Sequence, residues 1–218
     1  MSYLNKNMQT VLEKSELMFL DMANNNNVLS IVDDRLPFRM KGGADVFLAD
    51  KDAKKNLTPL AGIRMVIALK KNVEEKHKPQ AFGQLISSSL MAPRYCAPLS
   101  LLTDLNNHWC FTWFNEEKFV SAMTLHCPKS GFAFIEAVIL EQDNQISIPF
   151  VTPARPMKRL KIDDFLPELD DGAYEELERY ELMADSLEPS FLNERRMEYA
   201  EHLVKNTPIF AGYSYFSR

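Results

Sequence analysis

An aspartate and a lysine stand at the ends of two neighbouring apolar segments, in an arrangement that suits chemistry on phosphate esters. Asp45 opens the segment 44–49, and Lys70 closes the segment 63–69, 25 positions further along the chain. An acidic residue and a lysine on adjacent strands are the layout of a metal-dependent phosphodiesterase site. Such a site also needs a second carboxylate. Position 68, where that carboxylate should stand, holds alanine.

The elements that would position these residues follow from hydrophobic periodicity. Helical spacing predicts a helix from about Met8 to Met22, and a β-rich run predicts a short strand at Val28–Val32. Segments 44–49 and 63–69 are predicted strands. The second is a continuous apolar run, as expected for a strand that is buried on both faces.

The second half of the predicted sheet follows a helix. That helix resumes after Pro79 and has an apolar inner side. Two strands are then predicted at 98–103 and 109–115, joined by the turn-rich connector 104–107. A third strand is predicted at 131–140. The order of helix, strands, helix and strands predicts an α/β domain.

Composition limits the classes of function. With 218 residues, 46% of them apolar and 25% charged, the chain is an ordinary globular protein in size and composition. The net charge of −5 gives no global attraction to nucleic acid or anionic lipid, so a nucleic-acid role would rest on a local basic face. The longest apolar runs are far shorter than the ~20 residues of a membrane helix, and no signal peptide is recognised. Three widely spaced cysteines are typical of reduced thiols, which predicts an intracellular protein.

Several short segments together carry a resemblance to a known family. They are 43–46, 67–70, 79–85 and 101–104, followed by Trp109-Cys110-Phe111. In this order they resemble the PD-(D/E)XK nuclease superfamily and, more narrowly, the C-terminal domain of Crinkler-type effector proteins. The resemblance covers residues from about Met8 to Phe119. It implies a restriction-endonuclease-like core, a central mixed sheet flanked by helices.

The resemblance also implies roles for individual residues. Asp45 matches the metal-binding aspartate, with magnesium as the implied ion, and Lys70 matches the lysine of the same site. Gln84, with Gln80 one helical turn before it, matches the helix glutamine that contacts substrate or the attacking water. A glutamate of the first helix sometimes adds a metal ligand, a part that Glu16 or Glu13 would play.

Alanine at position 68 departs from the family pattern, which places a carboxylate two residues before the lysine so that both side chains share one side of the strand. Magnesium binding is therefore expected to be weak or absent. The same residues also have purely structural interpretations. An aspartate after two glycines is commonly a turn residue, and Gln80 and Gln84 suit an exposed helix face.

Two charged segments follow the predicted nuclease-like core. Lys158, Arg159 and Lys161 form a compact basic cluster after Pro153 and Pro156. An extended, accessible cluster of this kind predicts nuclear import, whereas the alternative is a solvated linker. The acidic segment 163–188 predicts amphipathic helices that pack on the core or bind a partner.

The sequence therefore predicts two regions. Residues 1–150 form the restriction-endonuclease-like domain, and residues 151–218 form a basic linker and an acidic helical extension packed on it. The expected function is that of a Crinkler-like effector domain inside a host cell, in the nucleus, with weak or degenerate nuclease activity. The alternatives are an active magnesium-dependent endonuclease and a protein-interaction module that uses the fold as a scaffold. Nucleic acid and a host nuclear protein are the candidate partners, and none is a membrane.

Overall fold

The computed structural model describes residues 1–33, 35–36, 38–56, 58–140, 145–146, 157–166 and 189–206. Its contacts divide the chain into two units. The first comprises Met1–Ser30 and Met40–Asp164, and the second comprises Ile31–Arg39 and Phe165–Arg218. The predicted boundary at 150/151 and most of the acidic segment, 167–188, lie outside the described residues. Among the described helices, none is both long and apolar enough to cross a bilayer.

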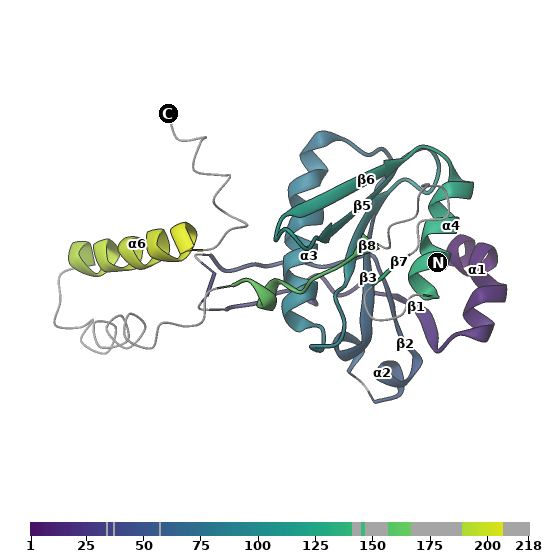
Figure 1. The fold of residues 1–218 in the computed structure, drawn as a ribbon, viewed down its shortest axis with the longest axis horizontal. Coiled ribbons are helices and arrows are strands. Elements are labelled where there is room, and N and C mark those ends of the chain that lie inside the picture. The colour runs from purple at the N-terminus through teal and green to yellow at the C-terminus, as the bar shows by residue number, and fades with distance from the viewer. Residues whose placement is uncertain are drawn as a thin grey trace. The chain divides into compact units, whose positions relative to one another are not determined.

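A six-stranded mixed sheet organises the first unit, in the order β1-β2-β3-β4-β5-β6 (Figure 1). The strands are β1 (Leu17–Asp21), β2 (Val46–Asp50), β3 (Ile63–Leu69), β4 (Leu99–Thr103), β5 (Trp109–Phe114) and β6 (Val120–Leu125). All neighbours are antiparallel except β3 and β4, which run parallel because helix α3 (Lys78–Met91) connects them. The predicted α/β class is confirmed.

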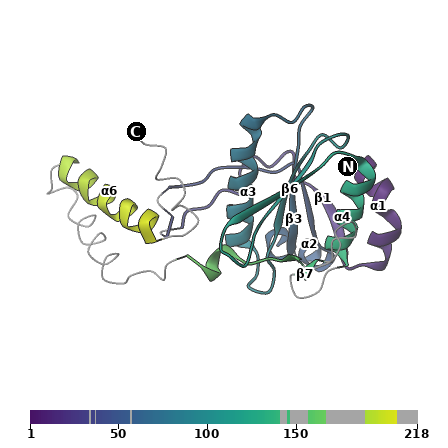
Figure 2. The same ribbon diagram turned by 45° about the horizontal axis from the view of Figure 1, so that its top comes forward.

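Helices lie on both faces of the sheet. Helices α1 (Ser2–Lys14) and α4 (Pro128–Ile139) cover one face, and α3 covers the other (Figures 1 and 2). The larger core lies under α1 and α4, where Leu4, Trp109 and Phe134 are fully buried. Under α3, Ala68 packs with Ala81, Leu102 and Cys110.

Short elements complete the first unit. They are helix α2 (Lys51–Lys55), strands β7 (Gln145–Ile146) and β8 (Met157–Lys158), and the 3-10 helices η1 (Pro59–Gly62), η2 (Glu75–His77) and η3 (Ile162–Asp164). In the second unit the described helix is α6 (Pro189–Asn206), and Leu192 on it is buried.

Three of the predicted elements are wrong. Residues 17–21 continue as strand β1 and not as the predicted helix 8–22, because Ser15 ends α1 in an extended conformation. Residues 28–32 form turns and an isolated bridge, not a strand. The apolar run 131–140 lies in helix α4, which Pro128 begins and the Cys127 side chain caps. The strand that completes the sheet is β6.

Candidate functional site

Asp45 is attached to the neighbouring strand at two points. Its N–H donates to the Ile67 carbonyl at 3.1 Å, and its Oδ2 accepts the Leu69 N–H at 2.6 Å. Asp45 immediately precedes β2, and Lys70 immediately follows β3, which runs antiparallel to β2. The two residues therefore lie at the same end of adjacent strands. The prediction that segments 44–49 and 63–69 pair in one sheet is confirmed.

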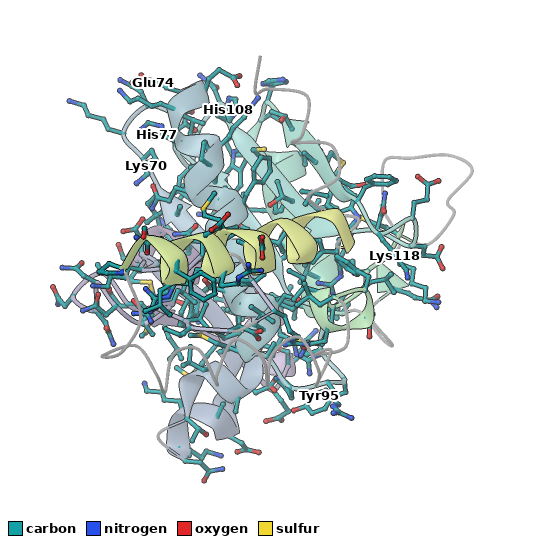
Figure 3. All side chains as sticks on the ribbon, turned by 90° about the vertical axis from the view of Figure 1, so that its left-hand side faces the viewer. Lys70, Glu74, His77, Tyr95, His108 and Lys118 are labelled. Carbon is teal, nitrogen blue, oxygen red and sulfur yellow. The ribbon has the colours of Figure 1, made fainter. Side chains whose placement is uncertain are left out.

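Lys70 lies where the two parallel strands end. Its N–H donates to the Thr103 carbonyl at 2.9 Å, and its side chain is half-buried. In Figure 3 the side chains of Lys70, Glu74, His77 and His108 gather toward one end of this unit, the end where α3 begins. The carboxyl ends of parallel strands are where α/β proteins commonly place binding sites.

Gln84 reaches the same region from α3. Its Nε2 donates to the Gly43 carbonyl at 2.8 Å, and the residue is only 4% exposed. Its Oε1 is buried without a hydrogen-bond partner among the described residues. Gly43 lies so close to the Asn25 carbonyl that a Cβ would be 2.9 Å from its oxygen. Gln84 thus fixes the turn that precedes Asp45, while Gln80, one helical turn earlier, is exposed and does not share this contact.

Ala68 lies on the α3 side of β3. It is fully buried and packs with Ala81, Leu102 and Cys110. Asp45 also lies on this side, since Val46, the next residue along, packs in the opposite core. The missing carboxylate would thus share a face with Asp45, but it would be enclosed beneath a helix that packs on alanine.

The predicted participation of Glu16 is wrong. The register pairs Leu17 with Asp50 and Asp21 with Val46, so Glu16 stands at the far end of β1 from Asp45. Five residues of strand separate those ends by roughly 17 Å. Glu13 lies still further from Asp45 along the chain, and its Oε1 accepts a hydrogen bond from Gln9 Nε2 at 2.8 Å. The prediction failed because Glu16 falls between the end of α1 and the start of β1, and Glu13 lies on an exposed side of α1.

The described residues do not fit the implied magnesium ion. No group of three or more His, Cys, Asp or Glu side chains among them could hold a metal. The nearest glutamates along the chain after Lys70 are engaged with lysines, Glu74 with Lys76 and Glu75 with Lys78, each at 2.8 Å. We therefore derive no metal-dependent step.

Asp104 is a residue of this sheet end that the sequence interpretation missed. Its Oδ1 accepts the N–H groups of Asn106 and His108, both at 2.9 Å. Partial burial raises the pKa of Asp104, but these N–H donors outweigh it and hold the pKa below its usual value. The signal was present in the connector Asp104-Leu105-Asn106-Asn107, because an aspartate before a turn commonly accepts such bonds.

Two histidines meet near this connector. The rings of His108 and His126 lie edge to face with centroids 6.0 Å apart, and the His126 Nδ1 is 3.3 Å from the Asn107 carbonyl. Cys127 follows at the start of α4, where a hydrogen bond with the Ser130 hydroxyl lowers the pKa of the thiol. Their separation in sequence concealed the pairing of the two rings.

The basic cluster is not the accessible segment that the sequence predicted. Arg159 is 2% exposed and Lys161 is 4% exposed. The Lys161 ammonium donates to the Ala92 carbonyl at 2.5 Å and pairs with Asp163 at 3.1 Å, while Arg159 donates to the Ala97 carbonyl. The expected exposure is wrong for both because they satisfy carbonyls that follow α3. Lys158 remains exposed, and Pro153 and Pro156 lie outside the described residues.

Comparisons with known proteins point to one group of relatives. The chain is 28% identical over 229 residues to Crinkler effector protein 4 of Phytophthora capsici, with 99% of this chain and 52% of that protein covered. It is 27% identical over 230 residues to Crinkler effector protein 2 of Phytophthora infestans, covering 99% of this chain and 48% of that protein. The chain resembles Crinkler effector proteins over nearly its whole length.

A third relative agrees. Crinkler effector protein 63 of Phytophthora sojae is 27% identical over 236 residues, with 99% of this chain and 50% of that protein covered. The chain thus spans about half the length of the Crinkler proteins it matches. No family model and no solved structure matches it. The Crinkler part of the predicted resemblance is supported, whereas the nuclease superfamily is not shown.

Proposed function

We propose that this chain is a Crinkler-like effector domain that acts inside a host cell through binding, on a scaffold of restriction-endonuclease-like origin. Its similarity to three Crinkler effector proteins along 99% of its length supports the effector part. The nuclease-derived origin is supported by the order of elements around Asp45 and Lys70. Binding, and not metal-dependent cleavage, is the activity that the geometry favours.

The burial of Ala68 is the observation that carries this proposal. A two-carboxylate site needs its second ligand at that position, and the side chain there is enclosed against Ala81 and Leu102. The first ligand, Asp45, is also committed, because its Oδ2 accepts a main-chain N–H of β3. A carboxylate oxygen that already accepts a main-chain N–H is less available to coordinate magnesium.

A protein partner suits this chain better than nucleic acid. The net charge is −5, and two of the lysines near the start of α3, Lys76 and Lys78, are paired with glutamates. Neutralised lysines attract phosphates less, and long stretches of nucleic acid are repelled by an acidic chain. Nuclear action stays a prediction, and the burial of Arg159 and Lys161 gives no support to an import signal at this cluster.

Expression inside host cells tests the proposal. Wild type and Asp45→Asn, which keeps an acceptor for Leu69 N–H, should alter host-cell viability and transcripts equally. A core variant, Phe111→Asp, should lose the effect because the fold is lost. If Asp45→Asn folds as wild type, by thermal unfolding, and yet loses the host response, the charge of Asp45 is needed and the binding proposal is wrong.

The second candidate function is an active nuclease. The adjacency of Asp45 and Lys70 favours it, because this part of the expected site is assembled. It would require a second metal ligand from outside the described residues. Direct measurement of cleavage separates the two candidates.

A further inference from the structure

We propose that strand β6 pairs antiparallel with β6 of a second copy of this chain, so that two six-stranded sheets join into one across a two-fold axis. β6 (Val120–Leu125) is an edge of the sheet and pairs with β5 on one side (Figure 1). The inference does not depend on Asp45, Lys70 or Gln84, so it can fail or succeed separately from the function proposed above.

The register with β5 fixes which main-chain groups of β6 face outward. The Asn115 N–H donates to the Phe119 carbonyl at 2.9 Å, at the turn end of this antiparallel ladder. Hydrogen-bonded pairs recur at every second residue, so the odd-numbered residues of β6 bond to β5. The even-numbered residues Val120, Ala122 and Thr124 therefore direct their N–H and C=O groups to the open edge. Within the described part of the chain, no other strand pairs with them.

An open edge of this length is normally protected in a monomeric protein. Charged side chains, proline and β-bulges are the usual means, because each discourages a further strand from pairing. β6 has none of them. Its sequence, Val-Ser-Ala-Met-Thr-Leu, holds no charged residue and no proline, and its pairing with β5 continues without a register shift. The edge is therefore suited to accept another strand.

The sequence of β6 is complementary to a second copy of itself. With Ala122 on the two-fold axis, Ala122 lies opposite its own equivalent, and Val120 lies opposite Thr124 of the second copy. The outward-directed residues then exchange about six main-chain hydrogen bonds. A shift by one residue would instead place them opposite residues that are already bonded to β5. Because the strand holds no charge, this pairing places no like charges opposite each other within it.

The same register covers an exposed aromatic side chain. Phe119, which immediately precedes β6, is 56% exposed. It lies opposite Leu125 of the second copy, and Leu125 is half-buried and packs against the larger core. Directly opposite residues share a face of the sheet, with Cβ atoms about 4.5–5.5 Å apart. Pairing therefore gives Phe119 an apolar neighbour at each end of the joined strands.

Two other occupants fit this edge less well. A phosphate backbone finds no cation along β6. An extended segment of another protein would use the same main-chain groups, whereas a second copy also matches β6 in length and covers Phe119 at both ends. The second copy is therefore the occupant that the edge fits.

Disulfide formation between introduced cysteines tests the register. Ala122→Cys places two thiols opposite each other in a hydrogen-bonded pair, whose Cα atoms lie about 5.5 Å apart, a distance that a disulfide spans. Thr124→Cys is the matched control, because Thr124 is exposed on the same face but its two copies would lie four residues apart, roughly 13 Å. Both changes are made in Cys127→Ser, which removes the exposed native thiol and keeps a capping side chain for α4.

Sedimentation equilibrium of the whole chain, at concentrations up to about 500 μM, measures association without a cross-link. Ala122→Lys should weaken the dimer, because two lysines would lie opposite each other on the axis. Thr10→Lys is the control for added charge, since Thr10 is exposed on α1, away from β6. Circular dichroism of dilute samples establishes that all variants fold.

The wild type should sediment as a dimer of the 25.1 kDa chain. Ala122→Lys should dimerise at least about ten-fold more weakly, and Thr10→Lys equally well. Under mild oxidation, Ala122→Cys should form a disulfide-linked dimer and Thr124→Cys should not. The proposal is overturned if the wild type stays monomeric across this range, if the two lysine variants associate alike, or if Ala122→Cys cross-links no better than Thr124→Cys.

Discussion

Single side chains at the end of β3 decide what chemistry this chain supports. The Asp45 N–H donates to β3 and the Asp45 carboxylate accepts an N–H of β3, so the carboxylate helps to hold the two strands together. Gln84 holds the preceding turn through the Gly43 carbonyl. Ala68 fills the place of the expected second ligand with a methyl group beneath α3. Asp45 and Gln84 thus make structural hydrogen bonds beside an apolar Ala68, and the three positions do not supply the ligands of a metal site.

Replacing Ala68 with glutamate should destabilise the fold and should not create a metal site. The position is 0% exposed, so a carboxylate there is either buried with its charge or displaces α3. We expect a loss of about 3 kcal/mol or more in unfolding free energy by urea denaturation. Ala68→Gln, of similar size but uncharged, is the control. Magnesium-dependent stabilisation of Ala68→Glu would contradict this expectation.

Asp104 should make the stability of the connector depend on pH. Its pKa is lowered in the folded state, so the stability it contributes is complete above its ordinary pKa of about 3.9 and is lost as pH falls through the folded value. Asp104→Asn keeps an acceptor but cannot titrate. Its unfolding free energy should therefore fall less than that of wild type between pH 5 and pH 2, in circular dichroism melts. Parallel losses would show that Asp104 is not responsible.

At the scale of elements, the sequence predicted strands correctly where nearly every residue of the strand is buried. β3 begins and ends at the predicted Ile63 and Leu69, because a continuous apolar run between a turn and a lysine leaves a two-sided strand as the simplest solution. β4 and β5 were found because the turn-rich connector 104–107 separates two apolar segments. Because both β2 and β3 were predicted correctly, the position of Asp45 beside the end of β3 could also be predicted.

The failures arose where an apolar run suits two structures. Residues 131–139 alternate poorly but bury Phe134, Ile135 and Val138 on one helical face, which periodicity alone does not separate from a buried strand. The missed signals were Pro128 and the cap at Cys127. For the candidate site, the enclosure of Ala68 and the burial of Lys161 depend on how α3 packs, which no local pattern encodes.

Two helix glycines give a matched test of this packing. A Cβ at Gly131 of α4 would overlap the Trp109 ring, whereas a Cβ at Gly83 of α3 meets nothing within 4 Å. Gly131→Ala should cost about 2 kcal/mol because the close contact must be relieved. Gly83→Ala should stabilise the chain by about 0.5–1 kcal/mol because alanine is the better helix former. Thermal or urea unfolding measures both, and equal effects would contradict the placement of α4 against β5.

At the scale of the whole molecule, the segment that follows β8 belongs to the first unit. The Ile162 N–H donates to the Ser89 hydroxyl at 2.9 Å, and Leu160 bridges to Phe114 at the end of β5. Arg159 and Lys161 also bind this segment to the first unit, because their side chains donate hydrogen bonds to main-chain carbonyls that follow α3. The same cations that suggested import from the sequence hold the chain together.

Alanine substitutions at Lys161 and at Lys158 should show whether this cluster serves the stability of the fold or nuclear import. Lys161→Ala should lower the unfolding free energy by about 2 kcal/mol, because a buried carbonyl and Asp163 lose their partner. Lys158→Ala, at an exposed pair with Glu116, should change it by less than about 0.5 kcal/mol. In a fusion too large to diffuse through nuclear pores, Lys158→Ala should leave localisation unchanged. Loss of nuclear signal in that stable variant would restore the import role of the cluster.

Cleavage by the purified chain tests the central claim most directly. Circular and linear DNA and RNA would be incubated with the wild type and with Asp45→Asn, in magnesium, in manganese and in chelator. Binding without metal-dependent catalysis predicts no cleavage by wild type above the level of Asp45→Asn in any condition. Robust cleavage that requires the metal and disappears in a folded Asp45→Asn would contradict the account and establish an active nuclease.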